Sequence, residues 1–226
     1  MITANVYNRV FFIKGEDYGT AFAIDHAGKQ YLVTAKHLVG SERLQVFRFF
    51  LDKIWVDVSA ELLGLAGGGA DVAVFRVDRI LCPRDLPLEP SSNGICISQD
   101  VFFVGFPYKM WTDAGSALMG RPCPFVKKGI LSSAFVGDDG VARLYVDALN
   151  NPGFSGGPIV FQPPGSKEFK VAGVVSKFRI DFERVLDKRG DETGMTVAYN
   201  TGFLVGYDIS RAIEIIERNP VGLAIP

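Results

Sequence analysis

The residues best suited to chemistry lie in one segment, residues 151–158, with the sequence NPGFSGGP. Glycines on both sides of Ser155 remove side chains from a tight bend, so backbone N–H groups can converge beside its hydroxyl. A space of this kind can hold the oxyanion of an acyl-transfer intermediate. A Gly-x-Ser-x-Gly segment by itself is also typical of a turn that precedes a buried strand. The segment therefore needs a partner before it indicates catalysis.

A nucleophilic serine needs a base, and the only two histidines, His26 and His37, both precede Ser155. This order excludes the α/β-hydrolase arrangement, in which the histidine follows the serine. His26 lies in the sequence DHAGK between two alternating apolar runs, which predicts a solvated hairpin residue. His37 comes just after the apolar run 31–34, which predicts a buried strand. His37 is thus the candidate base.

Asp71 is the candidate acid among the ten aspartates between His37 and Ser155. It follows a three-glycine turn and opens the apolar sequence VAVF, so we expect its carboxylate to be partly buried. A buried charge needs a partner. The His37 imidazole can supply an N–H and keep its other nitrogen for the serine. Asp78 at the end of the same strand and the outward-alternating Asp57 are expected to be solvated.

Four segments together resemble the signature motifs of trypsin-like serine peptidases, in the order His, Asp, Ser. They are GTAF at 19–22, TAKH at 34–37, DVAV at 71–74 and GFSGGP at 153–158. The sequence DALNNPG at 147–153 is most similar to the HtrA/Deg-type branch, and the resemblance covers nearly the whole chain. It implies an all-β fold of two antiparallel six-stranded β-barrels (the chymotrypsin/trypsin-like fold) with a C-terminal helix and no PDZ domain.

The same resemblance implies a serine endopeptidase that works through an acyl-enzyme. Ser155 would attack the scissile carbonyl, His37 would transfer the proton, and Asp71 would orient the imidazole. The backbone N–H groups of Gly153 and Ser155 would form the oxyanion hole, with no metal or organic cofactor. Secreted digestive relatives activate when a new N-terminus forms an ion pair with an aspartate just before the serine. Phe154 occupies that position here, so packing, oligomerisation or binding must order the oxyanion hole instead.

The substrate is expected to be a polypeptide bound as an extended strand by β-augmentation along residues 171–176. By resemblance, Ser176 is also expected to hydrogen-bond the Asp71 carboxylate. By family position, the pocket for the residue before the cut is expected to have no carboxylate at its base, which disfavours Lys and Arg and favours small or medium apolar side chains. The predicted substrate-binding residues are Leu149, Asn150, Ser176, Lys177 and Phe178.

Two units are predicted: residues 1–90, an N-terminal barrel with the histidine and aspartate, and residues 91–226, a C-terminal barrel with the serine. A segment rich in Pro, Ser and Asn at 83–94 is expected to link them. A helix is predicted at 208–219, because apolar residues recur there at helical spacing. We expect that stripe to pack against the second barrel.

The segment 179–192 contains nine charged residues of both signs among fourteen. This composition predicts a solvated loop. Its place beside the predicted substrate groove also leaves room for a regulatory or specificity role.

Composition sets further bounds. The 226 residues are 48% hydrophobic with a net charge of −1, which favours a globular core and disfavours nucleic acid as partner. Cys82, Cys96 and Cys123 are odd in number and irregularly spaced, which disfavours a zinc site and a disulfide-built secreted protein. The N-terminus lacks a signal-peptide pattern, and no apolar run reaches the ~18 residues of a membrane span. We therefore expect a cytoplasmic protein that binds no membrane.

Three other functions stay open from the sequence. The first is a catalytically quiet peptide-binding adaptor on the same fold. An esterase that uses the same residues is the second, and a viral processing protease is the third. Besides the polypeptide substrate, a regulatory partner or a homo-oligomer stays open, because binding or oligomerisation is one way to order the oxyanion hole.

Overall fold

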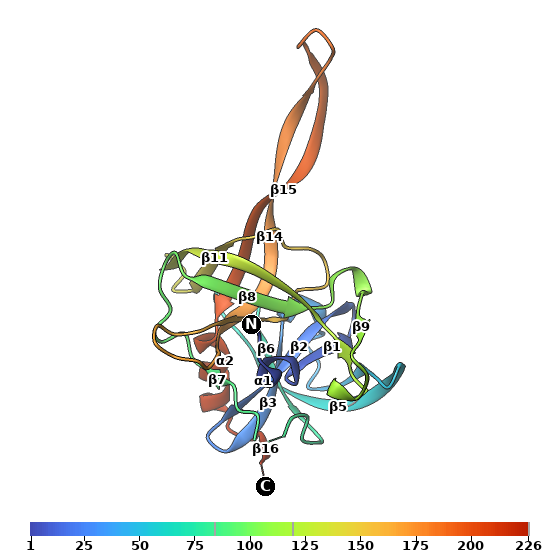
Figure 1. Ribbon diagram of the computed structural model, residues 1–226, viewed down its shortest axis with the longest axis vertical. Helices are drawn as coiled ribbons and strands as arrows, with labels where there is room; N and C mark the ends of the chain where they lie inside the picture. Colours follow the sequence, from blue (N-terminus) through green and yellow to red (C-terminus); the bar gives the residue numbers. More distant parts are fainter. Residues whose placement is uncertain (84, 119, 226) are drawn as a thin grey trace.

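Figure 1 shows the computed structural model, which describes residues 1–83, 85–118 and 120–225. The first sheet has the strand order β16-β3-β2-β1-β4-β5-β6, and a further pairing of β3 with β6 closes six of its strands into a barrel. The barrel strands are β1 (Val10–Lys14), β2 (Tyr18–His26), β3 (Lys29–Thr34), β4 (Leu44–Leu51), β5 (Ile54–Leu65) and β6 (Ala73–Val77).

A second sheet has the order β13-β8-β11-β12-β15-β14-β7, and pairing of β13 with β14 closes six strands again. These are β8 (Asp100–Gly105), β11 (Phe125–Val136), β12 (Ala142–Asp147), β13 (Pro158–Phe161), β14 (Lys170–Leu186) and β15 (Glu192–Asp208). The barrel pairings are antiparallel. The prediction of two antiparallel six-stranded barrels with a C-terminal helix is confirmed.

Short elements complete the chain and cross between the two halves. Strand β7 (Glu89–Pro90) runs parallel to β14 in the second sheet, and β16 (Leu223–Ala224) pairs with β3 in the first. The others are α1 (Ala4–Tyr7), β9 (Thr112–Asp113), β10 (Pro122–Cys123) and the 3₁₀ turns η1 (Lys36–Leu38), η2 (Pro107–Lys109) and η3 (Gly115–Leu118).

The β2–β3 hairpin shows how local sequence sets the first barrel. His26 pairs with Lys29 across a two-residue turn formed by Ala27 and Gly28, with φ of 49° and 73°. Positive φ at both positions defines the turn geometry whose twist matches a hairpin. The tight turn fixes the register of β3, and so the point at which the chain leaves the barrel toward His37.

One apolar cluster joins the two barrels and fixes their relative position. It includes Phe12 and Phe22 of the first barrel and Val104 of the second, together with Phe106 just beyond it. The rings of Phe12 and Phe106 stack with their centroids 4.9 Å apart. Because protein interiors pack densely and resist sliding, this contact holds residues carried by different barrels in a constant relation.

The C-terminal helix α2 (Ser210–Arg218) buries Ala212, Ile215 and Ile216 on one face. The expectation that this stripe packs on the second barrel is wrong, because α2 contacts β5 and β6 of the first barrel. Ile215 lies against Gly64, where an added Cβ would come within 2.8 Å of its Cγ2. The reason is that the chain returns toward the first sheet after β15. None of the described helices is long and apolar enough to cross a membrane.

The charged segment 179–192 is not a loop, as its composition suggested. Most of it forms the outer ends of β14 and β15, paired from Ile180 with Asn200 to Leu186 with Glu192. Apolar and charged side chains alternate along 180–183, which is the strand period. The charges are therefore the solvated positions of a hairpin that projects far beyond the barrel (Figure 1).

Candidate active site

Pairing of β3 with β6 brings the candidate base and acid together. Thr34, the last residue of β3, lies opposite Ala73, the first residue of β6. Because the two strands are antiparallel, the residues after Thr34 and before Ala73 emerge at the same end of the barrel. His37 lies on η1 after the first of these points, and Asp71 lies just before the second.

Three groups hold the Asp71 carboxylate. The Nδ1 atom of His37 lies 2.6 Å from Oδ2, and the backbone N–H of His37 donates to Oδ1 at 2.9 Å. The hydroxyl of Ser176 donates to Oδ2, as the family resemblance implied. Burial by itself raises the pKa of Asp71, but the hydrogen bonds from His37 and Ser176 outweigh it and hold that pKa below its usual value. Because an ionised carboxylate only accepts, Nδ1 carries the proton and Nε2 is left as the acceptor.

The Ser155 loop lies so close to other backbone that its glycines are required. A Cβ on Gly153 would lie 2.2 Å from the Phe106 carbonyl oxygen, and one on Gly156 would lie 2.1 Å from the Thr20 carbonyl oxygen. Their φ values are 104° and 81°, a region that other residues rarely adopt. The bend is thus built against both barrels, which a simple surface turn does not require.

Hydrogen bonds fix the direction of the loop backbone. The Thr20 hydroxyl donates to the Gly153 carbonyl at 2.7 Å, and the Thr20 N–H donates to the Ser155 carbonyl at 3.0 Å. The Gly156 N–H donates to the Val175 carbonyl at 2.8 Å. The N–H groups of Gly153 and Ser155 meet no acceptor within residues 1–83, 85–118 and 120–225. Within that part of the chain, both N–H groups are therefore left without an intramolecular acceptor.

The hydroxyl of Ser155 donates to the Ser176 carbonyl at 2.8 Å. Across the described part of the chain, no hydrogen bond joins it to His37, although both side chains line one cavity of about 530 Å³. A serine hydroxyl changes partner by rotating between staggered positions of χ1. Catalytic hydrogen bonds are often poorly aligned before substrate binds. In this structure the Ser155 hydroxyl is therefore directed toward the Ser176 carbonyl of β14.

The loop before Ser155 is held by a lysine and by packing. Lys127 Nζ donates to the Leu149 carbonyl and to Asn151 Oδ1, both at 2.5 Å. The Asn151 side-chain amide in turn donates to the Tyr108 hydroxyl at 3.0 Å. Phe154 is fully buried in the place where secreted relatives have an aspartate. Sequence reasoning missed Lys127, because its only visible signal was a short pair of basic residues.

Four of the five predicted substrate-binding residues line the same cavity: Asn150, Ser176, Lys177 and Phe178. Leu149 does not line it and is 59% exposed. Asn150 is only 1% exposed, and its Oδ1 accepts the Asn151 N–H. Among the described lining residues the sole carboxylate is Asp71, which His37 and Ser176 already bind.

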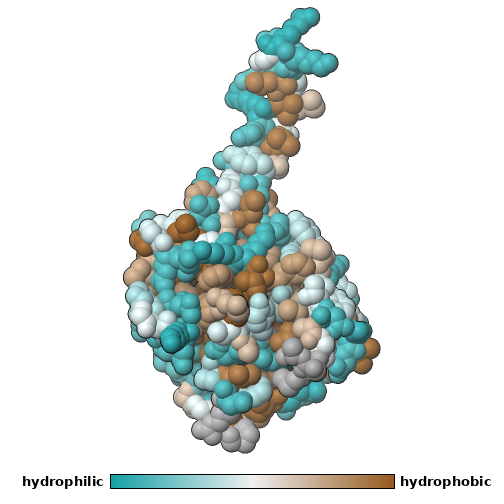
Figure 2. All heavy atoms as spheres, in the orientation of Figure 1, coloured by the Kyte–Doolittle hydropathy of each residue, from teal (hydrophilic) through white to brown (hydrophobic). Residues whose placement is uncertain are grey.

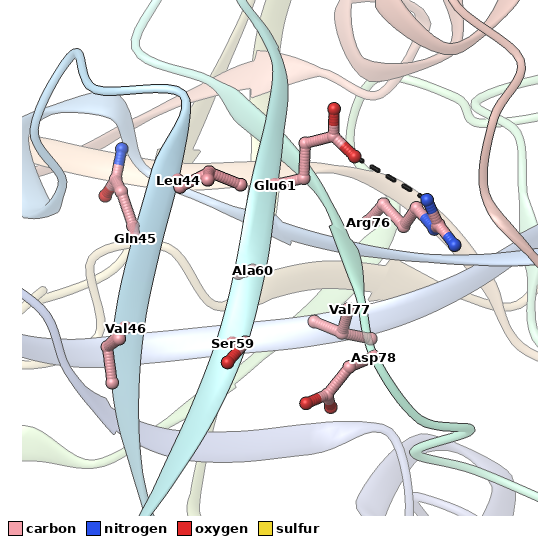
Figure 3. Close-up of a pocket in the computed structure, with 9 residues that line it drawn as sticks. All are labelled: Leu44, Gln45, Val46, Ser59, Ala60, Glu61, Arg76, Val77 and Asp78. Carbon is pink, nitrogen blue, oxygen red and sulfur yellow. Dashed lines mark ion pairs between the residues drawn. The ribbon is translucent and has the colours of Figure 1, made fainter.

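A second concavity, of about 380 Å³, lies on strands β4, β5 and β6 of the first barrel (Figure 3). Glu61 faces Arg76 there at 3.6 Å, and the exposed Leu44 and Val46 form one wall. No histidine lines it to activate Ser59. In the described residues, no group of three or more His, Cys, Asp or Glu side chains is arranged to hold a metal ion.

The sequence matches the trypsin-like peptidase domain family over residues 19–163, a region that contains His37, Asp71 and Ser155. The chain therefore belongs to that family. None of the curated protein sequences compared with this chain matches it.

Solved structures of HtrA-type and related proteases have a similar fold. Rv3671c protease of M. tuberculosis, in its inactive form, is 16% identical with a TM-score of 0.58, and the match covers 95% of this chain and 90% of that one. The serine endoprotease from Yersinia pestis is 19% identical (TM-score 0.58; 96% and 66% covered). The HtrA-type protease AlgW, solved with a tripeptide, is 20% identical (TM-score 0.58; 95% and 60% covered). This chain thus spans about two thirds or less of the latter two.

Proposed function

We propose that this chain is a serine endopeptidase that hydrolyses peptide bonds through an acyl-enzyme on Ser155. The observation that carries the proposal is the His37–Asp71 contact of 2.6 Å at the edge of the cavity that Ser155 also lines. Membership of the trypsin-like peptidase family supports it. We assign the oxyanion hole to the N–H groups of Gly153 and Ser155, which have no acceptor among the described residues.

The reaction begins when the Ser155 hydroxyl turns to His37. Its oxygen attacks the scissile carbonyl carbon while Nε2 takes the hydroxyl proton, and Asp71 stabilises the imidazolium through Nδ1–H. The carbonyl π electrons move to oxygen, where the N–H groups of Gly153 and Ser155 hold the negative charge. When the intermediate collapses, the C–N bond breaks and His37 gives its proton to the leaving amine. Water then repeats the sequence on the acyl-enzyme and releases the acid.

Substrate binding would itself prepare the nucleophile. The Ser176 carbonyl lies on the edge of β14 that faces the cavity, where it accepts the Ser155 hydroxyl. A peptide that adds to this edge donates N–H groups to outward carbonyls. Its N–H would replace the Ser155 hydroxyl on that oxygen, and the hydroxyl would then be released toward Nε2 of His37.

For the residue before the cut, we propose a small or medium apolar side chain. Phe178 lines the cavity, and the carboxylate among the described lining residues, Asp71, is already bound. A peptide panel varied only at this position tests the preference. Cleavage chiefly after Lys or Arg would refute it.

Labelling with a fluorophosphonate tests the enzyme directly. We expect reaction at Ser155 in the wild type and none in Ser155→Ala, with strongly reduced reaction in His37→Ala. In a triad enzyme, loss of the serine or histidine lowers turnover by about 10⁶. Ester turnover without cleavage of any peptide would indicate the esterase instead.

A catalytically quiet peptide-binding adaptor is the second candidate. The observation that favours it is the hydrogen bond of Ser155 to Ser176 in place of His37. Such an adaptor would bind extended peptides on β14 and would not react with the fluorophosphonate. Binding without labelling would therefore decide for the adaptor.

A further inference from the structure

The outer ends of β14 and β15 form a two-stranded hairpin with no third strand. The two strands pair from Ile180 with Asn200 outward, whereas β12 pairs with β15 only at 203–207 and β13 pairs with β14 only at 170–174. Within the described residues, both outer edges of the hairpin are therefore unpaired. Figure 1 shows it standing clear of the barrel at the end of the molecule opposite the C-terminus.

Both faces of this hairpin carry exposed apolar side chains. Phe182 pairs with Ala198 and shares a face with Ile180, and Val197 lies on the other face. Phe182 is 66% exposed and Val197 is 52% exposed. Figure 2 shows hydrophobic residues between hydrophilic ones along its length. An isolated two-stranded hairpin is marginally stable in water, and exposed apolar surface of this kind marks a binding site.

The hairpin is continuous with the candidate active site, and this continuity indicates that its ligand is the polypeptide substrate. Strand β14 runs unbroken from Lys170 to Leu186. Its residues Lys177, Phe178 and Ile180 line the cavity that holds Ser155. Because Ile180 and Phe182 share a face, an apolar stripe of these two side chains leads from that cavity onto the hairpin, and Arg184 follows it on the same face.

We propose that the β14 arm of the hairpin, residues 178–186, is an extended subsite for the polypeptide substrate, an inference that rests on the proposed peptidase function. A strand added antiparallel to β14 enters from the tip and reaches Ser176 with its C-terminal end. The arm therefore binds residues N-terminal to the scissile bond. Phe182 lies six positions beyond Ser176 along β14, so the added strand extends about 20 Å at the usual rise.

This geometry defines the substrate class. Residues directly opposite one another in a pair of strands have side chains on the same face. Substrate residues opposite Ile180 and Phe182 must therefore be apolar, at alternate positions, in a segment that is extended over about eight residues. Charges of both signs flank the stripe, with Arg179 and Asp181 on the other positions, so net charge is not what the arm selects.

Three peptides with the same residues around the cut test the arm. The first has four residues before the cut, the second has eight with alternate apolar residues, and the third has eight with serine at those positions. We expect the second to exceed the first about tenfold in kcat/KM, mainly through KM, from partial burial of Phe182 and its partner. The third should resemble the first.

Phe182→Thr is the test variant and Val197→Thr is the matched control on the opposite face. Threonine keeps the strand preference in both. Phe182→Thr should remove most of the length-dependent gain while leaving cleavage of the short peptide unchanged. Val197→Thr should keep the gain. Equal kcat/KM for short and long peptides, or equal effects of both variants, would overturn the proposal.

Binding to Ser155→Ala separates this inference from the proposed function. Fluorescence anisotropy of the same three peptides needs no turnover. Tighter binding of the long apolar peptide, lost with Phe182→Thr in the Ser155→Ala background, supports the arm even if the wild type never cleaves. Equal affinity for the short and long peptides in that assay would overturn the proposed subsite, even if fluorophosphonate labels Ser155. A dimer that Phe182→Thr dissociates, with no effect on peptides, also overturns it, because the stripe would then bind a second copy.

Discussion

Replacement of Gly153 by alanine tests whether the Ser155 loop is an oxyanion site. The added methyl carbon would lie 2.2 Å from the Phe106 carbonyl oxygen, whereas ordinary C···O contacts are about 3.3–3.6 Å. The alanine would also have to keep a φ of 104°. Both demands fall on Gly153, whose N–H we propose as an oxyanion donor.

The magnitude follows from the way the loop escapes the clash. Holding the unfavourable φ costs about 1–3 kcal/mol, and overpacking costs a further ~1–3 kcal/mol. Because Gly153 is partly exposed, turning its peptide group away from Phe106 costs less free energy than keeping both the unfavourable φ and the overpacked contact. That movement removes one oxyanion donor, so we expect kcat to fall about 10²–10³-fold with only a small change in Tm.

The assay is kcat and KM on a cleaved peptide, with fluorophosphonate labelling rate and Tm measured alongside. Gly165→Ala is the matched control, because Gly165 has a φ of 78° but nothing within 4 Å of an added Cβ. It carries the same kind of backbone strain without the clash. Activity of Gly153→Ala within about threefold of the control would refute the assignment, since a single lost donor is worth far more.

Three further predictions concern the surroundings of the site. Lys127→Met should lower kcat/KM about tenfold, because it leaves the oxygens of the 149–151 segment without their charged donor. The pKa of the Asp71 carboxyl is lower in the folded protein than in the unfolded chain. The ionised carboxylate therefore stabilises the fold at pH values above the unfolded pKa, and this stabilisation is lost as the pH falls through the folded pKa. The difference in unfolding free energy between wild type and Asp71→Asn should accordingly narrow below about pH 4. Native alkylation should label Cys96 well before Cys82, because burial raises the pKa of the Cys82 thiol to about 11.

Each of these has a matched comparison. Lys128→Met removes the neighbouring exposed lysine, which pairs with Asp100, and should leave kcat/KM unchanged; equal losses in both variants would contradict the lysine contact. If the difference in unfolding free energy between wild type and Asp71→Asn stayed constant from pH 7 to pH 2, the lowered pKa of Asp71 would be contradicted. For the thiols, mass spectrometry locates the label, and early modification of Cys82 would show that its burial is wrong.

The two strands that carry the candidate base and acid were predictable because their signals are local. One apolar run ends just before His37 and another begins just after Asp71, and the β3–β6 register then brings the two residues together. The Ser155 bend was visible for the same reason, since glycine is needed wherever backbone approaches backbone. These features depend on residue types next to each other in the chain.

Other features depended on contacts between distant residues, which no local pattern encodes. The charge density of 179–192 indicated a loop, and only pairing with 192–200 showed a hairpin. Lys127 looked like a surface charge until its contacts 22 and 24 residues away were seen.

The sequence by itself therefore determined the apolar runs beside His37 and Asp71 and the glycine bend at Ser155, because these follow from neighbouring residue types and steric need. The two-barrel fold class was predicted from the resemblance of four motifs to trypsin-like peptidases. Only the tertiary structure decided that the Ser155 hydroxyl rests on the Ser176 carbonyl, that α2 returns to the first barrel, and that an apolar stripe leads out of the cavity along β14. The first two outcomes are set by contacts between the two barrels and the third by the β14–β15 pairing, and all three join residues too far apart in the chain for a local pattern to encode.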